Sequence, residues 1–250
     1  MTNAIIDPLA IIELTNLKAA GKLEELAWHP QLGMRPEWVK ELVQNEHWRI
    51  RYNLAQNRAI ASSPKAIQTL ASDKNHLVRH SLAYNPSIAN YPEIIQALAT
   101  DENPHVRESL ATNPAIANFP EAIEALTNDE EWDVRFCLSS NFALAHLPDV
   151  IVTLSSNTDP AVRCGLASNP AIENFPTMIQ TLAADEDAYV RYNLAQNPAL
   201  AEFPEIIKKL ASDKDPDVRI ALAQNPTISS STASTNSWQT TQPVTQAPTI

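Results

Sequence analysis

The chain has 250 residues, a formal net charge of −11 and 44% hydrophobic residues, which is enough apolar material to bury a core. The acidic balance argues against nucleic acid or an anionic membrane surface as the main partner, because both are polyanions. With 3 glycines against 19 prolines, the composition favours helices interrupted at regular intervals over a sheet with tight turns.

Residues 1–35 form an incomplete copy of a unit that recurs later in the chain. Pro8 and Leu14 match the unit's first helix, but Leu23 stands where the later copies carry an arginine. We therefore predict a degenerate N-terminal capping repeat. No cationic segment followed by an apolar run is present, and no run reaches the ~18 apolar residues of a membrane span. We expect neither a signal peptide nor a membrane partner, and a cytoplasmic location.

Residues 36–228 repeat every 28 residues without insertion or deletion, which is typical of repeat architectures. The recurring arginines are Arg51, Arg79, Arg107, Arg135, Arg163, Arg191 and Arg219. The recurring asparagines are Asn57, Asn85, Asn113, Asn141, Asn169, Asn197 and Asn225. The recurring prolines are Pro36, Pro64, Pro92, Pro120, Pro148, Pro176 and Pro204.

The unit at 92–119 shows how each copy should fold. Pro92 suits the first turn of a helix, where its missing N–H is not needed. Ile95 and Leu98 begin an apolar stripe, and a second, shorter apolar pattern follows at 106–111. Isolated helices this short are marginal, so each copy must pack on its neighbours. The pattern predicts an all-α solenoid, or superhelix, of about eight 28-residue two-helix repeats.

The C-terminal segment 229–250 is rich in Ser, Thr and Gln and has no charged side chain. Such a composition cannot build a packed core of its own. We predict a disordered tail.

The pattern D-x-x-x-x-V-R-x-x-L-A-x-N-P is complete at Asp185–Pro198 and Asp213–Pro226. It resembles the leucine-rich repeat variant family and, more distantly, HEAT-like repeats, over residues 36–226. The resemblance implies a right-handed, armadillo-like superhelix of paired helices, and it allows one helix of each pair to be 3₁₀. It also implies a scaffold, because these families are mostly scaffolds.

Aspartate and arginine occur six residues apart in five of the copies. The pairs are Asp73 and Arg79, Asp101 and Arg107, Asp129 and Arg135, Asp185 and Arg191, and Asp213 and Arg219. They could form a stripe for an acidic partner, or a structural ladder in which each Asp accepts from backbone amides or from an Arg of its own or the next copy. We favour the ladder, because HEAT-like repeats use such a pair in that way. The asparagines before proline, including Asn85, Asn113, Asn169 and Asn197, should form a second polar ladder.

An interaction face is predicted where the copies vary. If Val106 faces the core, Glu108 lies about 200° and Thr112 about 240° around the helix, so both positions should be exposed. The first position reads Tyr52, His80, Glu108, Phe136, Cys164, Tyr192 and Ile220, and the second position includes Tyr84. Exposed aromatic and apolar side chains are typical of binding surfaces. The open alternative is that neighbouring helices or the tail cover them.

No nucleophile–base set, pair of carboxylates in a pocket or glycine-rich phosphate loop is visible, so we predict a non-catalytic scaffold for a protein or peptide. Neither cofactor nor metal is expected. His76, His80 and His105 could come together, but no Cys or carboxylate completes a metal-ligand set. The alternative is a HEAT-like lyase-type accessory protein that handles a chromophore or other small molecule, with Cys164 and the aromatic residues as its motivation. A nucleic-acid-binding solenoid ranks third.

One copy departs from the pattern. It has Phe142 in place of proline, Asn157 in place of aspartate and Gly165 inside a short helix. Glycine costs about 1 kcal/mol in a helix interior. We therefore predict that residues 136–166 open more easily than the rest of the stack.

Overall fold

The computed structural model describes residues 8–228, which form helices and short links without a strand. The first helices of successive pairs are α1 (Pro8–Ala19), α3 (Pro36–Leu42), α5 (Pro64–Ala71), α7 (Pro92–Ala99), α9 (Pro120–Thr127), α11 (Pro148–Ser155), α13 (Pro176–Leu182) and α15 (Pro204–Ala211). The second helices are α2 (Leu23–Trp28), α4 (Trp48–Gln56), α6 (His76–Tyr84), α8 (Pro104–Ala111), α10 (Trp132–Ser139), α12 (Pro160–Ser168), α14 (Ala188–Gln196) and α16 (Pro216–Gln224).

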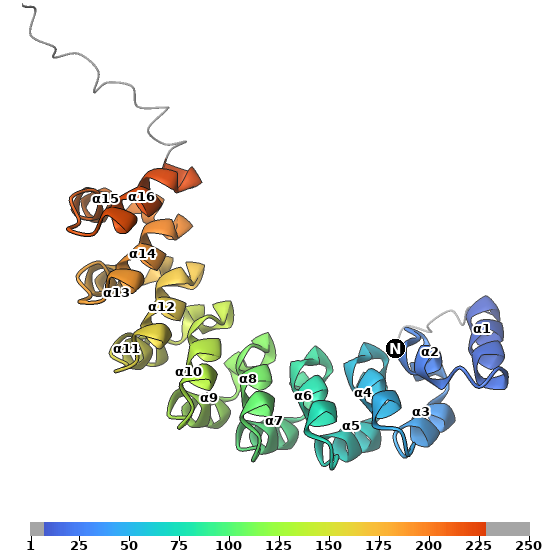
Figure 1. The fold of residues 1–250 in the computed structure, drawn as a ribbon. Coiled ribbons are helices and arrows are strands. Elements are labelled where there is room, and N and C mark those ends of the chain that lie inside the picture. The colour runs from blue at the N-terminus through green and yellow to red at the C-terminus, as the bar shows by residue number, and fades with distance from the viewer. Residues whose placement is uncertain (1–7, 229–250) are drawn as a thin grey trace, which may run out of the picture.

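The pairs stack into an open arc (Figure 1). Each second helix contacts the second helix of the next pair, in order from α2 to α16. In Figure 1 the first helices lie on the outer edge of the arc and the second helices lie inside them. This arrangement confirms the all-α solenoid that the 28-residue period predicted.

A 3₁₀ helix follows each pair except the last within the described residues. These elements are η1 (Leu32–Met34), η2 (Arg58–Ser62), η3 (Pro86–Asn90), η4 (Pro114–Asn118), η5 (Phe142–His146), η6 (Pro170–Asn174) and η7 (Pro198–Glu202). Both helices of every pair are therefore α-helical, and the 3₁₀ turn is a third element in the return segment. In η4 the N–H of Phe119 donates to the carbonyl of Ile116 at 2.8 Å, an i to i+3 bond that tightens the short return.

Proline and polar caps set the helix starts. Proline occupies the first position of every first helix from α3 to α15, as the spacing predicted. Several second helices begin behind an Asn or Asp whose side chain accepts a backbone N–H. Asn103 Oδ1 accepts from His105 at 3.0 Å, and Asp187 Oδ1 accepts from Tyr189 at 2.7 Å. Each such cap satisfies a donor that the helix itself leaves free.

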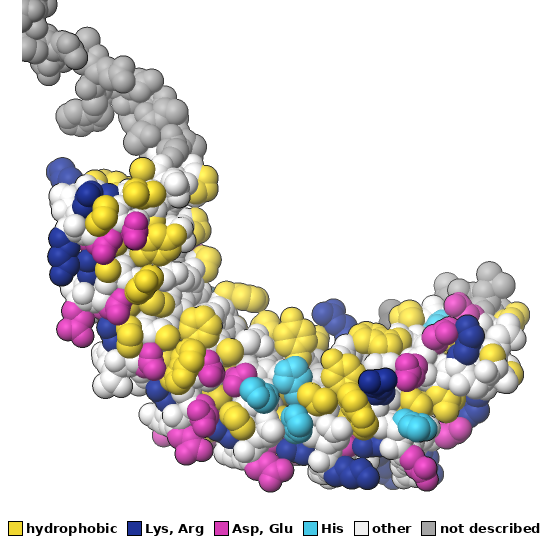
Figure 2. Space-filling view, in the orientation of Figure 1, with side chains coloured by type: hydrophobic (Ala, Val, Ile, Leu, Met, Phe, Trp, Pro, Cys, Tyr) yellow, Lys and Arg dark blue, Asp and Glu magenta, His cyan; other side chains and the backbone are white. Residues whose placement is uncertain are grey.

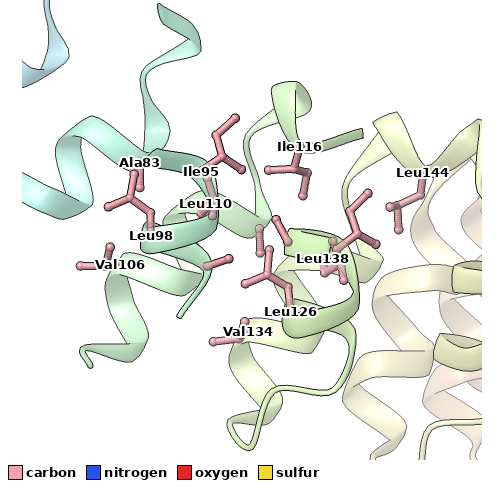
Figure 3. Close-up of a cluster of buried hydrophobic side chains, with 14 of the residues drawn as sticks. Ala83, Ile95, Leu98, Val106, Leu110, Ile116, Leu126, Val134, Leu138 and Leu144 are labelled. Carbon is pink, nitrogen blue, oxygen red and sulfur yellow. The ribbon is translucent and has the colours of Figure 1, made fainter. Parts of the chain in front are cut away.

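All three kinds of element contribute to the core. Ile95 and Leu98 from α7, Val106 and Leu110 from α8, and Ile116 from η4 are fully buried (Figure 3). Full burial of one such side chain stabilises the fold by roughly 1.5–3 kcal/mol. One buried cluster continues from Leu14 to Ile228, so the described residues form a single stack.

Within the predicted cap 1–35, the described residues 8–35 keep the same order of helix, helix and 3₁₀ turn in α1, α2 and η1. Its turn differs, because Gly21 has φ of 69° between the two helices. That conformation favours glycine, and no other described residue has a positive φ. The predicted disorder of 229–250 concerns residues outside those that the structure describes.

Candidate interaction face

The arginine ladder runs between repeats. Arg79 on α6 donates from Nε and Nη2 to the Asp101 carboxylate of the next repeat, at 2.7 and 2.9 Å. Its Nη1 donates to the carbonyl of Asp73, six residues earlier, at 2.7 Å. The Asp and Arg that are six residues apart thus meet only through a backbone carbonyl. The bidentate ion pair, the strong kind of polar contact, joins an Arg to an Asp that is 22 residues further along.

Five rungs share this geometry. They are Arg51–Asp73, Arg79–Asp101, Arg107–Asp129, Arg163–Asp185 and Arg191–Asp213. In each rung the carboxylate also accepts the backbone N–H two residues further on. Hydrogen bonds from Arg191 hold the pKa of Asp213 below its ordinary value, and they outweigh the opposing effect of burial. The rungs thus hold neighbouring repeats together.

Arg135 and Arg219 do not form such a rung. Opposite Arg135 the next repeat has Asn157, so the Nε of Arg135 is buried without a hydrogen-bond partner. Its Nη1 donates to the carbonyls of Asp129 and Glu130. Arg219 lies on the last described helix, and its Nη1 donates to the carbonyl of Asp213 at 2.6 Å. At these two positions the predicted ladder lacks a carboxylate from a following repeat.

The asparagines form a second set of contacts between repeats. Asn113 is fully buried, and its Nδ2 donates to the carbonyls of Ala83 at 2.8 Å and Asn85 at 3.3 Å. Its Oδ1 accepts from the N–H of Ala115 at 3.0 Å and so caps η4. The amide side chain supplies two N–H donors and one oxygen acceptor, so a single residue makes all of these contacts. The same contacts to the preceding repeat recur at Asn57, Asn85, Asn141, Asn169, Asn197 and Asn225.

The predicted face is partly covered. Its half-buried members are Tyr52, His80, Glu108, Cys164 and Tyr192. The exposure estimated from a single helix was wrong for these side chains, because the second helices of neighbouring repeats pack along both flanks. Phe136 (37% exposed), Ile220 (52%) and Tyr84 (65%) are exposed as predicted.

Large side chains of the first helical turns complete this surface, and the sequence analysis missed them. Leu77 is 37% exposed, Trp132 43% and Tyr189 74%. Their spacing could have identified them, because each lies three or four residues before a position already assigned to the face. We define the lateral face as the exposed large apolar residues of the second helices from α6 onward: Leu77, Tyr84, Trp132, Phe136, Tyr189 and Ile220.

Aromatic pairs stiffen two places on this side of the arc. The rings of Trp132 and Phe136 lie 6.4 Å apart at 61°, and those of Trp48 and Tyr52 lie 6.1 Å apart at 81°. Edge-to-face pairs of this kind are favourable beyond the area that they bury. Figure 2 shows hydrophobic side chains spread along this side of the arc, with a group of histidines near its middle.

The histidines on α6 and α8 lie near one another. Nδ1 of His105 is 3.2 Å from a carboxylate oxygen of Glu108. Burial lowers the pKa of His80, and the charges of His105 and His76 lower it further. Among the described residues, no three His, Cys, Asp or Glu side chains are placed to hold a metal ion.

Both cysteines are free thiols that burial makes harder to ionise. Burial, followed by the charges of Glu108 and Asp133, raises the pKa of Cys137 to about 11. Burial also raises the pKa of Cys164. Because the thiolate is the reactive form, these environments disfavour thiol chemistry at neutral pH.

These features define a helical repeat protein with most of its repeated polar residues turned inward and a variable lateral face. The chain is similar to a solved structure described as a leucine-rich repeat variant with a novel repetitive motif, at 20% identity and a TM-score of 0.36, covering 81% of this chain and 84% of that one. It is also similar to an engineered protein, at 16% identity and a TM-score of 0.22, covering 87% of this chain and 96% of that one. No protein-family model and no curated protein matches the sequence. None of the described helices has the length and apolar character needed to cross a membrane.

Proposed function

We propose that the protein is a non-catalytic scaffold whose lateral face binds a protein or peptide. The observation that carries the proposal is the exposure of large apolar and aromatic side chains along the second helices. Tyr84, Trp132 and Tyr189 have relative exposures of 65%, 43% and 74%. Aromatic side chains are enriched among the residues that dominate binding energy at protein interfaces.

The internal ladders support this assignment by elimination. The asparagines and most of the arginines that recur every 28 residues are occupied by contacts between repeats, as at Asn113 and Arg107. The positions that vary between repeats are the ones left to face a partner. We also propose that the repeats are of the leucine-rich repeat variant or HEAT-like kind, because of the D-x-x-x-x-V-R pattern. A cytoplasmic location, where free thiols stay reduced, is part of the same proposal.

The small-molecule alternative has less support. It needs a reactive group, and Cys164 was its candidate. Burial raises the pKa of that thiol, which keeps it protonated and weakly nucleophilic at neutral pH.

The test compares two variants of the full chain as bait. The face variant carries Leu77→Ala, Tyr84→Ala and Phe136→Ala, and the control carries Ile12→Ala and Val152→Ala, two exposed apolar positions on first helices. Each bait captures partners from an extract of the source cells, and bound proteins are quantified by mass spectrometry. We expect at least one specific partner to fall about tenfold or more with the face variant and to stay with the control. Equal capture by all baits of matching thermal stability would refute the proposal.

A further inference from the structure

The first turns of α14 and α16 enclose a groove on the lateral face. Its volume is about 490 Å³, and it is lined by Ala188, Tyr189, Tyr192, Asp215, Asp217 and Ile220. Tyr189 and Asp217 occupy equivalent positions in consecutive repeats, as do Tyr192 and Ile220. The groove therefore has an aromatic wall from one repeat and an acidic and apolar wall from the next.

The aromatic wall is open and partly fixed. Tyr189 is 74% exposed, so its ring is free to contact a ligand. The hydroxyl of Tyr192 accepts a hydrogen bond from Gln196 Nε2 at 3.0 Å, which holds that ring along the helix. Because the two tyrosines are three residues apart on one helix, their rings lie on the same side.

The acidic wall lies near one cation, Arg191, which interacts with the charge of Asp215 but is itself paired with Asp213. Asp215 Oδ1 accepts from the N–H of Asp217 at 2.8 Å, and neither aspartate forms an ion pair within the part of the chain that the structure describes. The guanidinium of nearby Arg219 donates instead to the carbonyls of Asp213 and Lys214, at 2.6 and 3.3 Å. No lysine or arginine lines the groove.

We propose that this groove binds the arginine or lysine side chain of a basic peptide. The ammonium or guanidinium group would lie against the tyrosine rings and the two carboxylates, and the aliphatic stem would contact Ile220. A cation over a tyrosine face and beside an acidic group is attracted by both. This inference rests on the proposed function and names the chemistry of the partner. The formal net charge of −11 favours the approach of the same kind of partner.

The equivalent positions of earlier repeats lack this combination. Between α6 and α8 they are Leu77 and His80 facing His105 and Glu108, with two imidazoles and one carboxylate. The C-terminal segment 229–250 has no charged side chain to match the aspartates. A basic peptide from another molecule therefore fits the groove better than the protein's own C-terminal segment.

Fluorescence polarisation with the full chain tests the proposal. The probe is a short labelled peptide in which arginine and leucine alternate, and the matched peptide has glutamate in place of arginine. We expect Tyr189→Ala and Asp217→Asn each to weaken binding of the arginine peptide by about tenfold, and added salt to weaken it as well. Glu173→Gln, which removes one exposed negative charge from η6, should leave binding within about twofold of the parent protein.

Four results would overturn the assignment. The first three are equal binding of the glutamate peptide, an equal loss with Glu173→Gln, and retained binding in both groove variants. The fourth is displacement of the probe by a synthetic peptide of residues 229–250 at matching concentration, because it would make the C-terminal segment the occupant. Thermal unfolding of each variant checks that the stack is intact.

The two proposals fail separately. Leu77, Tyr84 and Phe136 lie outside the groove lining, so the face variant does not alter it. If the arginine peptide does not bind but the face variant still loses its partner, the basic-peptide inference is wrong and the scaffold function stands. If the peptide binds through Tyr189 and Asp217 but the face variant captures normally, the wider face is wrong.

Discussion

Two consecutive interfaces of the stack, α8 with α10 and α10 with α12, follow one plan and differ in one charge. At the first, Arg107 donates to the Asp129 carboxylate at 2.6 and 2.9 Å. At the second, Arg135 meets Asn157, and its Nε has no partner. The asparagine contacts cross both interfaces without change. The stacking geometry is therefore kept where the ion pair is missing, and we expect the ion pair to add stability to it.

The second interface also has a closer approach between helices. A Cβ atom at Gly165 would clash with Ser139 Oγ at the end of α10 and would lie 2.9 Å from Oγ of the capping residue Ser140. Gly165, which is unfavourable for a short helix by propensity alone, is thus required by the close packing of α12 on α10. The interrupted interface has thus lost an ion pair and gained a close helix contact.

The largest expected effect comes from converting the first interface into a copy of the second. Asp129→Asn keeps an oxygen that can accept the N–H of Glu131, but it leaves the buried Arg107 without a carboxylate. We expect a loss of about 3 kcal/mol in the free energy of unfolding, measured by urea denaturation. Asp149→Asn, at an exposed position on α11, is the control and should cost no more than about 0.5 kcal/mol. A loss at Asp129 no larger than the control's would show that the ladder adds no stability.

Adding a methyl group at the close contact should be the next largest effect. Helix propensity alone predicts that Gly165→Ala stabilises α12 by about 1 kcal/mol. The clash with Ser139 predicts instead a net loss of about 2 kcal/mol in the free energy of unfolding. Ser139→Ala removes the nearest clashing atom, so the cost of Gly165→Ala should be smaller in that background. A stabilising Gly165→Ala would contradict the close approach.

The spacing of residues predicted the frame of this molecule well. Proline at the helix starts, the buried stripe of Ile95 and Leu98, and the eight helix pairs all follow from a 28-residue period and short-range rules. The partner of each arginine did not follow from them. Arg79 pairs with Asp101 rather than with the Asp73 side chain because the stacking of whole repeats sets that distance.

The face was predicted less well for the same reason. The helical-wheel argument treated α8 as a lone cylinder and placed Glu108 in solvent, where neighbouring helices in fact half-cover it. It also missed Tyr189, because an alignment of equivalent positions does not show which turn of a helix projects beyond its neighbours. Burial by repeats before and after is a property of the stack and cannot be read from one unit.

Restoring the missing carboxylate should strengthen the second interface. Asn157→Asp places an acceptor opposite Arg135, as in the five complete rungs, and we expect a gain of about 1 kcal/mol. Hydrogen exchange gives a local measurement. In the parent protein the amides of α10 and α12 should exchange about tenfold faster than those of α6 and α8, and the substitution should reduce that difference. Uniform protection across 136–166 in the parent protein would refute the predicted weak point.

The smallest effect is a pH dependence. Acid should remove the stability that a complete rung adds, so that an interface with an ion pair comes to resemble the interface at Arg135. Hydrogen bonds from Arg191 lower the pKa of Asp213 below the value of about 3.9 typical of an unfolded chain. The unfolded state therefore binds a proton more readily than the folded state. The rung contributes its full stability at pH values above the unfolded pKa, and it loses that stability as the pH falls through the folded pKa. Asn157 does not titrate, so the interface at Arg135 has no such contribution to lose. The measurement is hydrogen exchange between pH 6 and about 3, corrected for the intrinsic exchange rate. We expect the amides of α14 and α16 to lose protection worth no more than about 1 kcal/mol, and those of α10 and α12 to change less. Asp213→Asn should abolish that extra loss at α14 and α16, and an equal decline in both regions would mean that the ion pair is not its source.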